Sequence, residues 1–568
     1  MKNLKRFLDK NIFWLVFLLS LPAIWALFVP GFYGASDEVH IAWLYEIYET
    51  IKLGQIPPRF VPDLSFGHGY PLFNFVFPLP YYIGSVFHYL GFSLVDSVKL
   101  VFFLSIPLSA IYMYKLLRLF SDQLSSLLGA IIYIYSPYRS TDIYVRGAIG
   151  EILAFTFLPL IVLSLIHLNK QIKVKFLRAK WIGVGAVAIA LLILSHNIVS
   201  YMFLPFVLVL ALMLLFGLGW SNKIAKTVFI TGLLGIVASS YFWIPAIFES
   251  SLMQYSTVFN YWDHFPTLRQ LITPYFGYGA SVPGPGDGMS FFVGFANLLL
   301  FILTLGVFLF KRKKMDLSDK TILGWSLFLV LFSVFMMNHR SAFIWKSVPL
   351  LPYFQFPWRF LTMITFSTPL MVISLKYLNF NGLFGIIMII LVIISFPFFR
   401  PQDFLGRTDD YFLAKYIPFP KVNPEYLTHQ EEYLRLPRTV TEKPPLMPAL
   451  YTFQKGGLVG IENVTEGRLG LEATVITDSD LNVSYSKYFF PGWIVTDNGR
   501  KIKSFTSPPY GDVTFLLEGK GVHQIKVYFK ETPFRFILNL ISLSALVLSL
   551  LLIYRPQVLS RKRLFDYV

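Results

Sequence analysis

The chain has 568 residues, of which 55% are hydrophobic and only 14% are charged. In soluble domains about a quarter of the residues are charged, and this chain also contains repeated long apolar runs, so the sequence predicts a polytopic membrane protein. The composition excludes an intrinsically disordered chain, a coiled coil and a DNA-binding protein, and the absence of cysteine excludes disulfides, thiolate metal sites and a cysteine nucleophile.

Apolar runs long enough to cross a bilayer divide most of the chain. Because a backbone in lipid must satisfy its own hydrogen bonds, each run is expected to form a helix of roughly 20 residues. We predict about twelve transmembrane helices, near 12–29, 98–119, 123–136, 148–168, 180–195, 198–218, 224–247, 290–310, 321–337, 357–377, 381–398 and 534–554.

A proline-containing apolar run at 71–90 decides the topology. Lys and Arg accumulate in cytoplasmic loops. The basic segments 170–180 and 311–314 share a side with the basic N-terminus only if 71–90 does not cross the membrane. We therefore predict that 71–90 is a re-entrant or interfacial segment and that both termini are cytoplasmic, in the cell membrane. Basic cytoplasmic loops then explain the net charge of +17, which indicates no nucleic-acid partner.

Between 399 and 533 the apolar runs stop. Short alternating segments such as LGLEATVI and VHQIKVYF are separated by turn-forming stretches such as DSD and EGKG. This pattern predicts a small antiparallel β-sandwich outside the cell membrane. The predicted domains are a transmembrane domain (1–398) with its first outer loop (31–97), an extracytoplasmic β-rich domain (399–533), and a last helix with a basic tail (534–568).

Two adjacent carboxylates and a histidine, Asp37, Glu38 and His40, follow the first predicted helix. Charges at the membrane are candidates for function, because placing them there costs free energy. One carboxylate could act as a general base that deprotonates an acceptor hydroxyl. The carboxylates could instead bind a divalent cation such as Mg²⁺ or Mn²⁺ through their oxygens.

A structural role for the same acidic residues is also consistent with the sequence. Residues 39–51 have the periodicity of an amphipathic helix that lies on the bilayer. Ser36 or Asp37 would then be the N-cap of that helix, and Glu38 would interact favourably with its N-terminus.

The next cluster of charges, Arg139, Asp142, Arg146 and Glu151, lies between two predicted helices. A guanidinium at the outer membrane face can bind a phosphate through two parallel hydrogen bonds. Arg139, Arg146 and Glu151 are therefore candidate substrate contacts. The alternatives are pairing of Arg146 with Glu151 and contact with lipid headgroups.

Further polar residues lie at helix ends or in a loop of the first outer region. His196 and Asn197 separate two predicted helices and are candidate substrate contacts; the alternative is a hydrogen-bonded structural histidine. Arg359 opens another helix and is either a second phosphate ligand or an interface anchor. His68 lies in a loop rich in glycine and aromatic residues, which suits close approach to a sugar or lipid and is also typical of ordinary turns.

Motifs for other chemistries are absent from the sequence. The nine histidines are scattered, with no H-E-x-x-H or comparable spacing, so a zinc site is not supported. There is also no Walker A motif, no dinucleotide fingerprint and no G-x-S-x-G.

An amphiphilic entry helix, an acidic pair in the first outer loop, about twelve helices and an outer soluble domain together resemble the GT-C class of membrane glycosyltransferases. The string Asp37-Glu38-Val39-His40 is similar to the acidic motif in the first loop of protein O-mannosyltransferases. The resemblance implies a polyprenyl-phosphate sugar donor, approached from the bilayer, and an envelope glycan, lipid or protein as acceptor. It implies that Asp37 is the general base, because Asp37 matches the position of the catalytic acid, with Glu38 as second choice.

Two other segments resemble known families. Ser36 to Tyr82 resembles the prokaryotic membrane family labelled 6-pyruvoyl-tetrahydropterin synthase-related, and Tyr488 to Trp493, followed by Asp497, resembles the C-terminal domain of YfhO-type proteins. The pterin label implies no activity here, because that enzyme is a soluble zinc protein and this chain has no matching histidine cluster.

Two other functional classes fit part of the sequence. A transporter or flippase of lipid-linked sugars fits the number of helices, although the halves of the chain show no similarity and the charges gather at one face. A non-catalytic membrane protein that binds envelope glycan fits the β-rich domain. The predicted fold class is an all-α, GT-C-like polytopic membrane protein with an extracytoplasmic β-sandwich.

Overall fold

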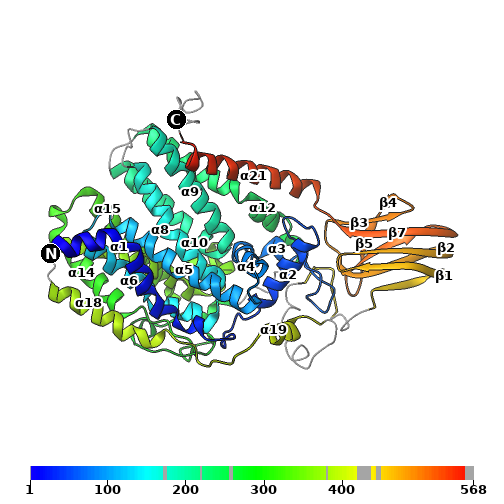
Figure 1. The fold of residues 1–568 in the computed structure, drawn as a ribbon, viewed down its shortest axis with the longest axis horizontal. Helices are drawn as coiled ribbons and strands as arrows, with labels where there is room; N and C mark the ends of the chain where they lie inside the picture. Colours follow the sequence, from blue (N-terminus) through cyan, green and yellow to red (C-terminus); the bar gives the residue numbers. More distant parts are fainter. Residues whose placement is uncertain are drawn as a thin grey trace.

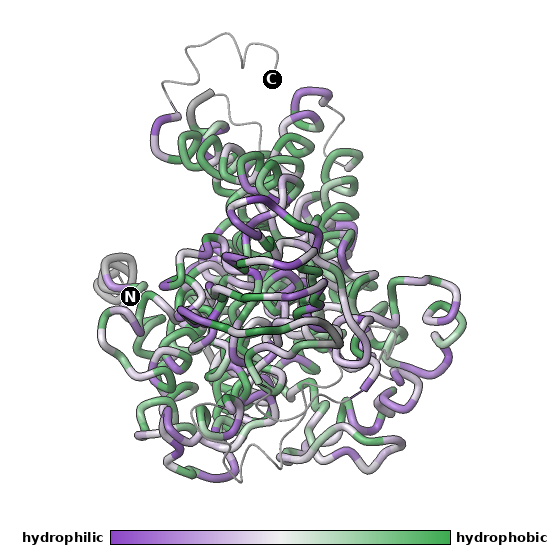
Figure 2. Tube along the Cα trace, turned by 90° about the vertical axis from the view of Figure 1, so that its right-hand side faces the viewer, coloured by the Kyte–Doolittle hydropathy of each residue, from purple (hydrophilic) through white to green (hydrophobic). Residues whose placement is uncertain are grey.

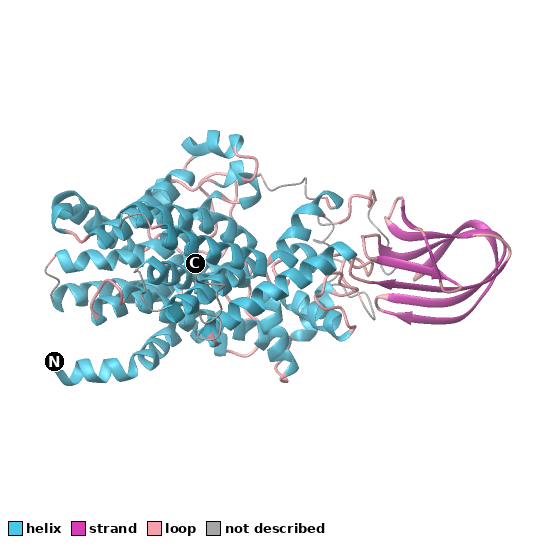
Figure 3. Cartoon of the chain, turned by 90° about the horizontal axis from the view of Figure 1, so that it is seen from above, coloured by secondary structure: helices cyan, strands magenta, loops and turns pink. Residues whose placement is uncertain are grey.

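Helices and strands occupy opposite ends of the molecule. The computed structural model describes residues 2–169, 175–217, 221–254, 260–378, 382–418, 436–442 and 449–556. A body of helices forms one end and a β-sheet the other (Figures 1 and 3). The last helix, α21 (Pro533–Tyr554), leads from the sheet back along the body (Figure 1). Apolar residues dominate the helices of the body, whereas its turns are more polar (Figure 2).

The body is built from helices whose lengths follow the apolar runs. They are α1 (Lys2–Ser20) with its 3₁₀ continuation η1 (Leu21–Phe28), α5 (Leu94–Leu117), α6 (Gln123–Ile134), α8 (Ile149–Asn169), α9 (Lys175–Ser195), α10 (Asn197–Gly217), α11 (Asn222–Ala238), α12 (Ser240–Phe248), α14 (Phe295–Lys311), α15 (Leu317–Met336), the consecutive η8 (Pro357–Phe360), α17 (Leu361–Ser367) and η9 (Thr368–Tyr377), and α18 (Gly382–Ser395). Shorter helices connect them: α7 (Pro137–Ser140), η2 (Thr141–Arg146), η3 (Ser250–Leu252), η4 (Tyr261–His264), α13 (Leu268–Ile272), η5 (Arg312–Lys314), η6 (His339–Ser341), α16 (Ala342–Ser347), η7 (Leu351–Phe354), η10 (Phe396–Phe398) and α19 (Asp409–Tyr416).

Within the described residues, nine helical segments are long and apolar enough to span a bilayer. Each coincides with a predicted apolar run, which confirms the polytopic, helical membrane region. The most buried span is α8, in which 94% of an 18-residue stretch lies inside the protein. Helix α8 packs against α5 and α9, so its first turn lies in the interior of the body.

The other three predicted runs are helical but are not single straight spans. Helices α11 and α12 meet at an angle of 68°, and the runs 123–136 and 381–398 form shorter apolar helices. The hydroxyl of Ser239, at the bend, donates hydrogen bonds to the carbonyls of Gly235 (3.2 Å) and Ile236 (3.1 Å). A serine that bonds back to the preceding turn favours bending of a helix, which explains the break.

The predicted first outer loop (31–97) contains three short helices, α2 (His40–Lys52), α3 (Leu72–Phe75) and α4 (Leu79–Tyr89). Helix α4 has 11 residues and is about 16 Å long, about half the thickness of a bilayer core. The run 71–90 therefore does not form one spanning helix, in agreement with the prediction.

Helix α2 differs from the predicted amphipathic helix on the bilayer surface. Residues on both of its faces, including Ile41, Leu44 and Ile47, are buried, and only Lys52 is exposed. The helix packs against α4, α5 and α19, so it is an interior element. The prediction was wrong because residues far along the chain cover the face that looks polar in the sequence.

The C-terminal domain forms an antiparallel sheet, which confirms the predicted β-rich domain. Its strands are β1 (Tyr451–Gly467), β2 (Gly470–Tyr488), β3 (Trp493–Asp497), β4 (Arg500–Ile502), β5 (Ser504–Ser507), β6 (Asp512–Leu517) and β7 (Gly521–Phe529), in the order β4-β3-β7-β2-β6-β5, with β1 beside β2.

The seven strands belong to one hydrogen-bonded sheet rather than to two separate sheets of a sandwich. One edge of β2 pairs with β7 over 470–477 and with β6 over 481–488, so the sheet divides at 478–480. Strand β3 of one branch contacts β6 of the other. The predicted sandwich is therefore a forked sheet whose branches share β2.

The sheet is docked on the first outer loop by charged side chains. The guanidinium of Arg468, in the β1–β2 turn, pairs with Glu49 (2.7 Å) and Asp63. The ammonium of Lys487 donates to the carbonyls of Pro62 (3.0 Å) and Gly67 (2.7 Å). The sheet therefore fixes the conformation of the loop that carries the acidic residues.

The start of α21 is held in the body by a buried ion pair. The Arg535 side chain is fully buried, and its Nε lies 3.1 Å from both carboxylate oxygens of Glu249.

Replacing Glu249 with alanine is expected to lower the free energy of unfolding by about 3–5 kcal/mol, because Arg535 would remain buried without its ion-pair partner. Thermal unfolding in detergent measures the loss. The same change at the exposed Glu518 is the control, and equal stability of the two variants would contradict the prediction.

Candidate active site

A cavity of about 2350 Å³ lies between the first outer loop and the helices of the body. Its polar end is lined by Asp37, His40, Arg146, His196 and Arg359, which come from distant parts of the sequence. From there it continues between α8, α9, α10, α11 and α12, where its lining is apolar. With Asn197, which also lines the cavity, six of the predicted site residues therefore meet in one place.

Backbone hydrogen bonds place Asp37 beside Arg146. The amide of Asp37 donates to the Arg146 carbonyl (2.7 Å), and the amide of Ser36 donates to the Val145 carbonyl (3.0 Å). The chain can turn away after Arg146 because Gly147 has a φ of +72°, a conformation that favours glycine.

The carboxylate of Asp37 is partly buried and makes no hydrogen bond to another described residue. It interacts electrostatically with both Arg146 and Arg359. The predicted capping role is not found, because α2 begins after Val39 and has no side-chain cap. Asp37 is therefore a cavity carboxylate that is available to a ligand.

Arg146 is paired with carboxylates of its own neighbourhood. Its Nη1 donates to Glu151 (2.7 Å) and to Asp142. Although burial acts against the charged form, these two carboxylates raise the pKa of Arg146. The pairing alternative for Arg146 and Glu151 is thus confirmed, and the positive charge of Arg146 is balanced before any ligand binds.

Glu151 lies behind Arg146 and does not line the cavity. Its Oε1 accepts hydrogen bonds from Tyr138 (2.8 Å) and Thr362 (2.6 Å), and Oε2 accepts from Arg146. All of these contacts hold Arg146 in place, so Glu151 positions another residue rather than contacting a substrate in the cavity. No local pattern in the sequence links Thr362 to this group.

Arg359 has a different environment from Arg146. Only 8% of its surface is exposed, yet its Nε and Nη1 make no hydrogen bond to any described residue. Its guanidinium lies over the ring of Phe356 at 5.5 Å. A buried cation without a bonded partner is costly, so this group indicates a site for an anionic ligand.

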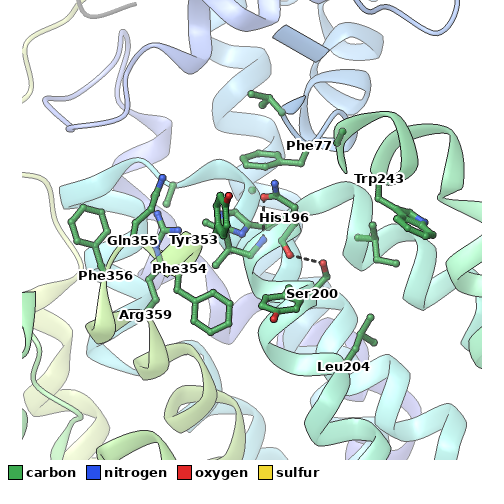
Figure 4. Close-up of a pocket in the computed structure, with 18 of the residues that line it drawn as sticks. Phe77, His196, Ser200, Leu204, Trp243, Tyr353, Phe354, Gln355, Phe356 and Arg359 are labelled. Atoms are coloured by element: carbon green, nitrogen blue, oxygen red, sulfur yellow. Dashed lines mark hydrogen bonds between the residues drawn. The ribbon is translucent and has the colours of Figure 1, made fainter. Parts of the chain in front are cut away.

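His196 forms part of the opposite wall (Figure 4). Its Nδ1 accepts a hydrogen bond from the amide of Val199 (3.2 Å), and burial lowers its pKa to about 3. The imidazole is therefore neutral, and its proton is on Nε2, which can donate to a ligand.

His40 lies nearby and contacts the hydroxyl of Tyr81 through Nδ1 (2.7 Å). Asn197 also lines the cavity.

Besides Glu151, three other predicted site residues lie outside the cavity. Glu38 is buried and pairs with Arg407 (2.9 Å) and Lys415. Arg139 is fully buried between the rings of Tyr133 and Phe155 and donates to Ser109. His68 contacts Asp512 (2.9 Å) and stacks on Tyr488 at the contact between the first loop and the sheet.

These three residues share one feature that the sequence does not show. Each finds its partner more than 25 positions away in the chain, so the sequence shows a polar residue at a membrane boundary but not the group that satisfies it. Glu38, with two cationic partners, is not available as a base. His68 and Arg139 have structural roles.

The described residues do not fit a metal site at this cavity. No group of three His, Asp or Glu side chains that could hold a metal ion occurs among them. The charged neighbours of Asp37 are the guanidiniums of Arg146 and Arg359, and these repel a divalent cation.

The wall near Arg359 also contains residues that the sequence did not single out as ligands. Tyr353, Phe354, Phe356 and Trp358 line the cavity, and Trp358 lies under Arg146 at 4.8 Å from the guanidinium. Aromatic residues at a helix start are usual at membrane interfaces. The sequence therefore did not indicate that these residues line a cavity.

No family model matches this sequence, so the two family resemblances outside the GT-C class are not confirmed. The chain is 23% identical over 364 residues to an uncharacterized protein of Lactococcus lactis subsp. cremoris (strain MG1363), a match that covers 61% of this chain. The chain spans about half of the length of that relative, 56%.

Two solved structures are similar in part. The arabinofuranosyltransferase AftD from Mycobacteria has a TM-score of 0.43 and 14% identity, over 69% of this chain and 26% of that chain. The oligosaccharyltransferase of Archaeoglobus fulgidus has a TM-score of 0.44 and 12% identity, over 78% of this chain and 60% of that chain. The chemistry of the cavity is therefore inferred from its own residues.

Proposed function

We propose that this protein is a membrane glycosyltransferase that transfers a sugar from a polyprenyl-phosphate donor to an envelope glycan, lipid or protein. One observation carries the proposal: a single cavity joins an apolar groove to a polar end that contains an unpaired guanidinium and an unbonded carboxylate among the described residues. A lipid-linked sugar phosphate has the matching order of an apolar tail, an anionic phosphate and a sugar.

The apolar part of the cavity supports a donor that enters from the bilayer. Leu208, Phe229 and Ile247 line the cavity and are 60%, 68% and 61% exposed. In a membrane these side chains face lipid, so an apolar chain can enter the groove without crossing water.

The charge balance at the polar end favours Arg359 as the main ligand of the phosphate. Arg146 is already neutralised by Asp142 and Glu151, whereas Arg359 has nitrogen donors without partners among the described residues. Charge-assisted hydrogen bonds from a guanidinium match phosphate oxygens. The neutral imidazole of His196 provides a further donor without adding charge.

Asp37 is the proposed general base. The acceptor hydroxyl transfers its proton to the Asp37 carboxylate while its oxygen attacks the anomeric carbon. The bond between that carbon and the phosphate oxygen breaks, its electron pair stays on the phosphate, and Arg359 stabilises the released anion. Attack from the side opposite the phosphate inverts the anomeric carbon.

In this proposal the polar end of the cavity and the β-sheet face the outside of the cell membrane, and both termini are cytoplasmic. The distribution of Lys and Arg in the sequence supports this orientation. The acceptor then approaches from the outer face, where the first loop and the sheet lie together.

The test uses the full chain in lipid with polyprenyl phosphates that carry glucose, mannose, galactose or arabinose, and an envelope extract as acceptor. Mass spectrometry follows loss of the donor and release of polyprenyl phosphate, with Mg²⁺, with Mn²⁺ and with a chelator. Turnover of one donor is the expected result.

Other outcomes would identify the alternative classes. Movement of a lipid-linked sugar across the bilayer without release of polyprenyl phosphate would overturn the proposal in favour of a flippase. Binding of envelope glycan, with every donor left intact, would overturn it in favour of a non-catalytic binding protein.

A further inference from the structure

A strained three-residue turn at Gln355 forms part of the cavity wall. Gln355 has φ +66° and ψ −46°, and the amide of Phe356 donates to the Phe354 carbonyl at 2.7 Å. These values describe a classic γ-turn, which is rare and strained. Its conformational free energy is higher for a residue with a side chain than for glycine. The strain is maintained between two proline-containing helices, η7 and η8.

The turn points a neutral amide at the ligand space. Gln355 lines the cavity, and Figure 4 shows its side chain beside that of Arg359, across from His196 and Phe77. The side-chain amide makes no hydrogen bond to any described residue. It is only partly buried, so it is open to the cavity.

We propose that Gln355 determines sugar specificity by binding a hydroxyl of the sugar whose phosphate is held by Arg359. This inference rests on the proposed function. An amide offers one acceptor and two donors, and so matches a hydroxyl, which both donates and accepts. A phosphate only accepts, and would leave the amide oxygen without a donor. A site that bonds a hydroxyl also discriminates against ligands without it.

The experiment measures binding of bare polyprenyl phosphate and of polyprenyl phosphate bearing each of the four sugars to the full chain in lipid. Wild type is expected to bind one sugar form about tenfold more tightly than the bare phosphate. The Gln355→Met variant keeps the size of the side chain but lacks the amide. It is expected to bind the sugar form and the bare phosphate equally. Binding of the bare phosphate should not change, which separates loss of a sugar contact from damage to the site.

A second variant tests the strain directly. Gln355→Gly is expected to unfold at the same temperature as wild type or higher, since glycine adopts positive φ freely, and still to lose the preference for the sugar form. Asn463→Gly is the matched control, because Asn463 also has a positive φ (52°) but lies in β1. Gln524→Met, on an exposed face of β7, controls for loss of a glutamine amide.

The outcomes distinguish this inference from the proposed function. Retention of the wild-type sugar preference by both Gln355 variants would overturn the role of Gln355 and leave the glycosyltransferase proposal intact. Failure of wild type to bind any of the five probes would overturn both. Equal binding of bare and sugar-bearing lipid by wild type would overturn the inference alone.

Discussion

Replacing Asp37 with asparagine is expected to lower the rate of sugar transfer by about 10²–10⁴-fold, the usual contribution of a general base. Asparagine has nearly the same shape but cannot accept the proton of the acceptor hydroxyl at neutral pH. The carboxylate makes no hydrogen bond to a described residue, and the hydrogen bonds that place residue 37 come from the backbone. The variant should therefore fold and should still bind the donor.

Transfer by purified wild-type and Asp37→Asn protein, at saturating donor, measures this effect, with thermal unfolding and donor binding recorded in parallel. Asp410→Asn is the matched control, because Asp410 is an exposed carboxylate in the first turn of α19 and makes no side-chain hydrogen bond or ion pair with a described residue. A folded Asp37→Asn variant with undiminished transfer would show that Asp37 is not the base.

Replacing Arg359 with glutamine is expected to weaken binding of bare polyprenyl phosphate by about 10–150-fold, the range for hydrogen bonds to a charged group. Because Nε and Nη1 of Arg359 have no partners among the described residues, the change removes no known structural hydrogen bond. The unfolding temperature should therefore stay the same or rise. Lysine should restore only part of the binding, because an ammonium keeps the charge but not the planar fork of donors.

Arg146→Gln provides the contrast for this experiment. Loss of the Arg146 guanidinium would leave Asp142 and Glu151 buried without their shared cation. We therefore expect the Arg146→Gln substitution to lower the free energy of unfolding by about 3–5 kcal/mol. Titration of labelled polyprenyl phosphate, together with thermal unfolding, separates the two roles. Arg359→Gln with wild-type phosphate affinity, or with a stability loss as large as that of Arg146→Gln, would contradict the assignment.

The difference between these two arginines also shows the limit of sequence analysis for this site. Arg146 and Arg359 look alike in the sequence, as single guanidiniums next to apolar helices. Glu151 is only five residues from Arg146, so their pairing could be considered from the sequence. The absence of a bonded partner for Arg359 among the described residues depends on which segments surround it, and only the packed structure provides that information.

Gln355 illustrates the same limit at the level of the backbone. The sequence Phe354-Gln355-Phe356-Pro357 does not predict a positive φ at Gln355, because glutamine rarely adopts one. The turn exists because the flanking short helices are held in the body by other contacts, which supply the free energy that the local conformation costs.

The sequence by itself determined that the chain is a membrane protein with many helices and a β-rich C-terminal domain. It also placed Asp37, Arg146, His196 and Arg359 at helix ends. These conclusions follow from local properties, because hydropathy over about 20 residues and alternation over a few residues decide whether a segment enters lipid or joins a sheet. Only the tertiary structure decided that α2 is buried, that Glu38 and His68 are used in packing, and that Asp37 and Arg359 face one cavity. The physical reason is that charge pairing and burial depend on contacts between segments hundreds of positions apart, as between Glu38 and Arg407, and the free energy of such contacts has no local signature.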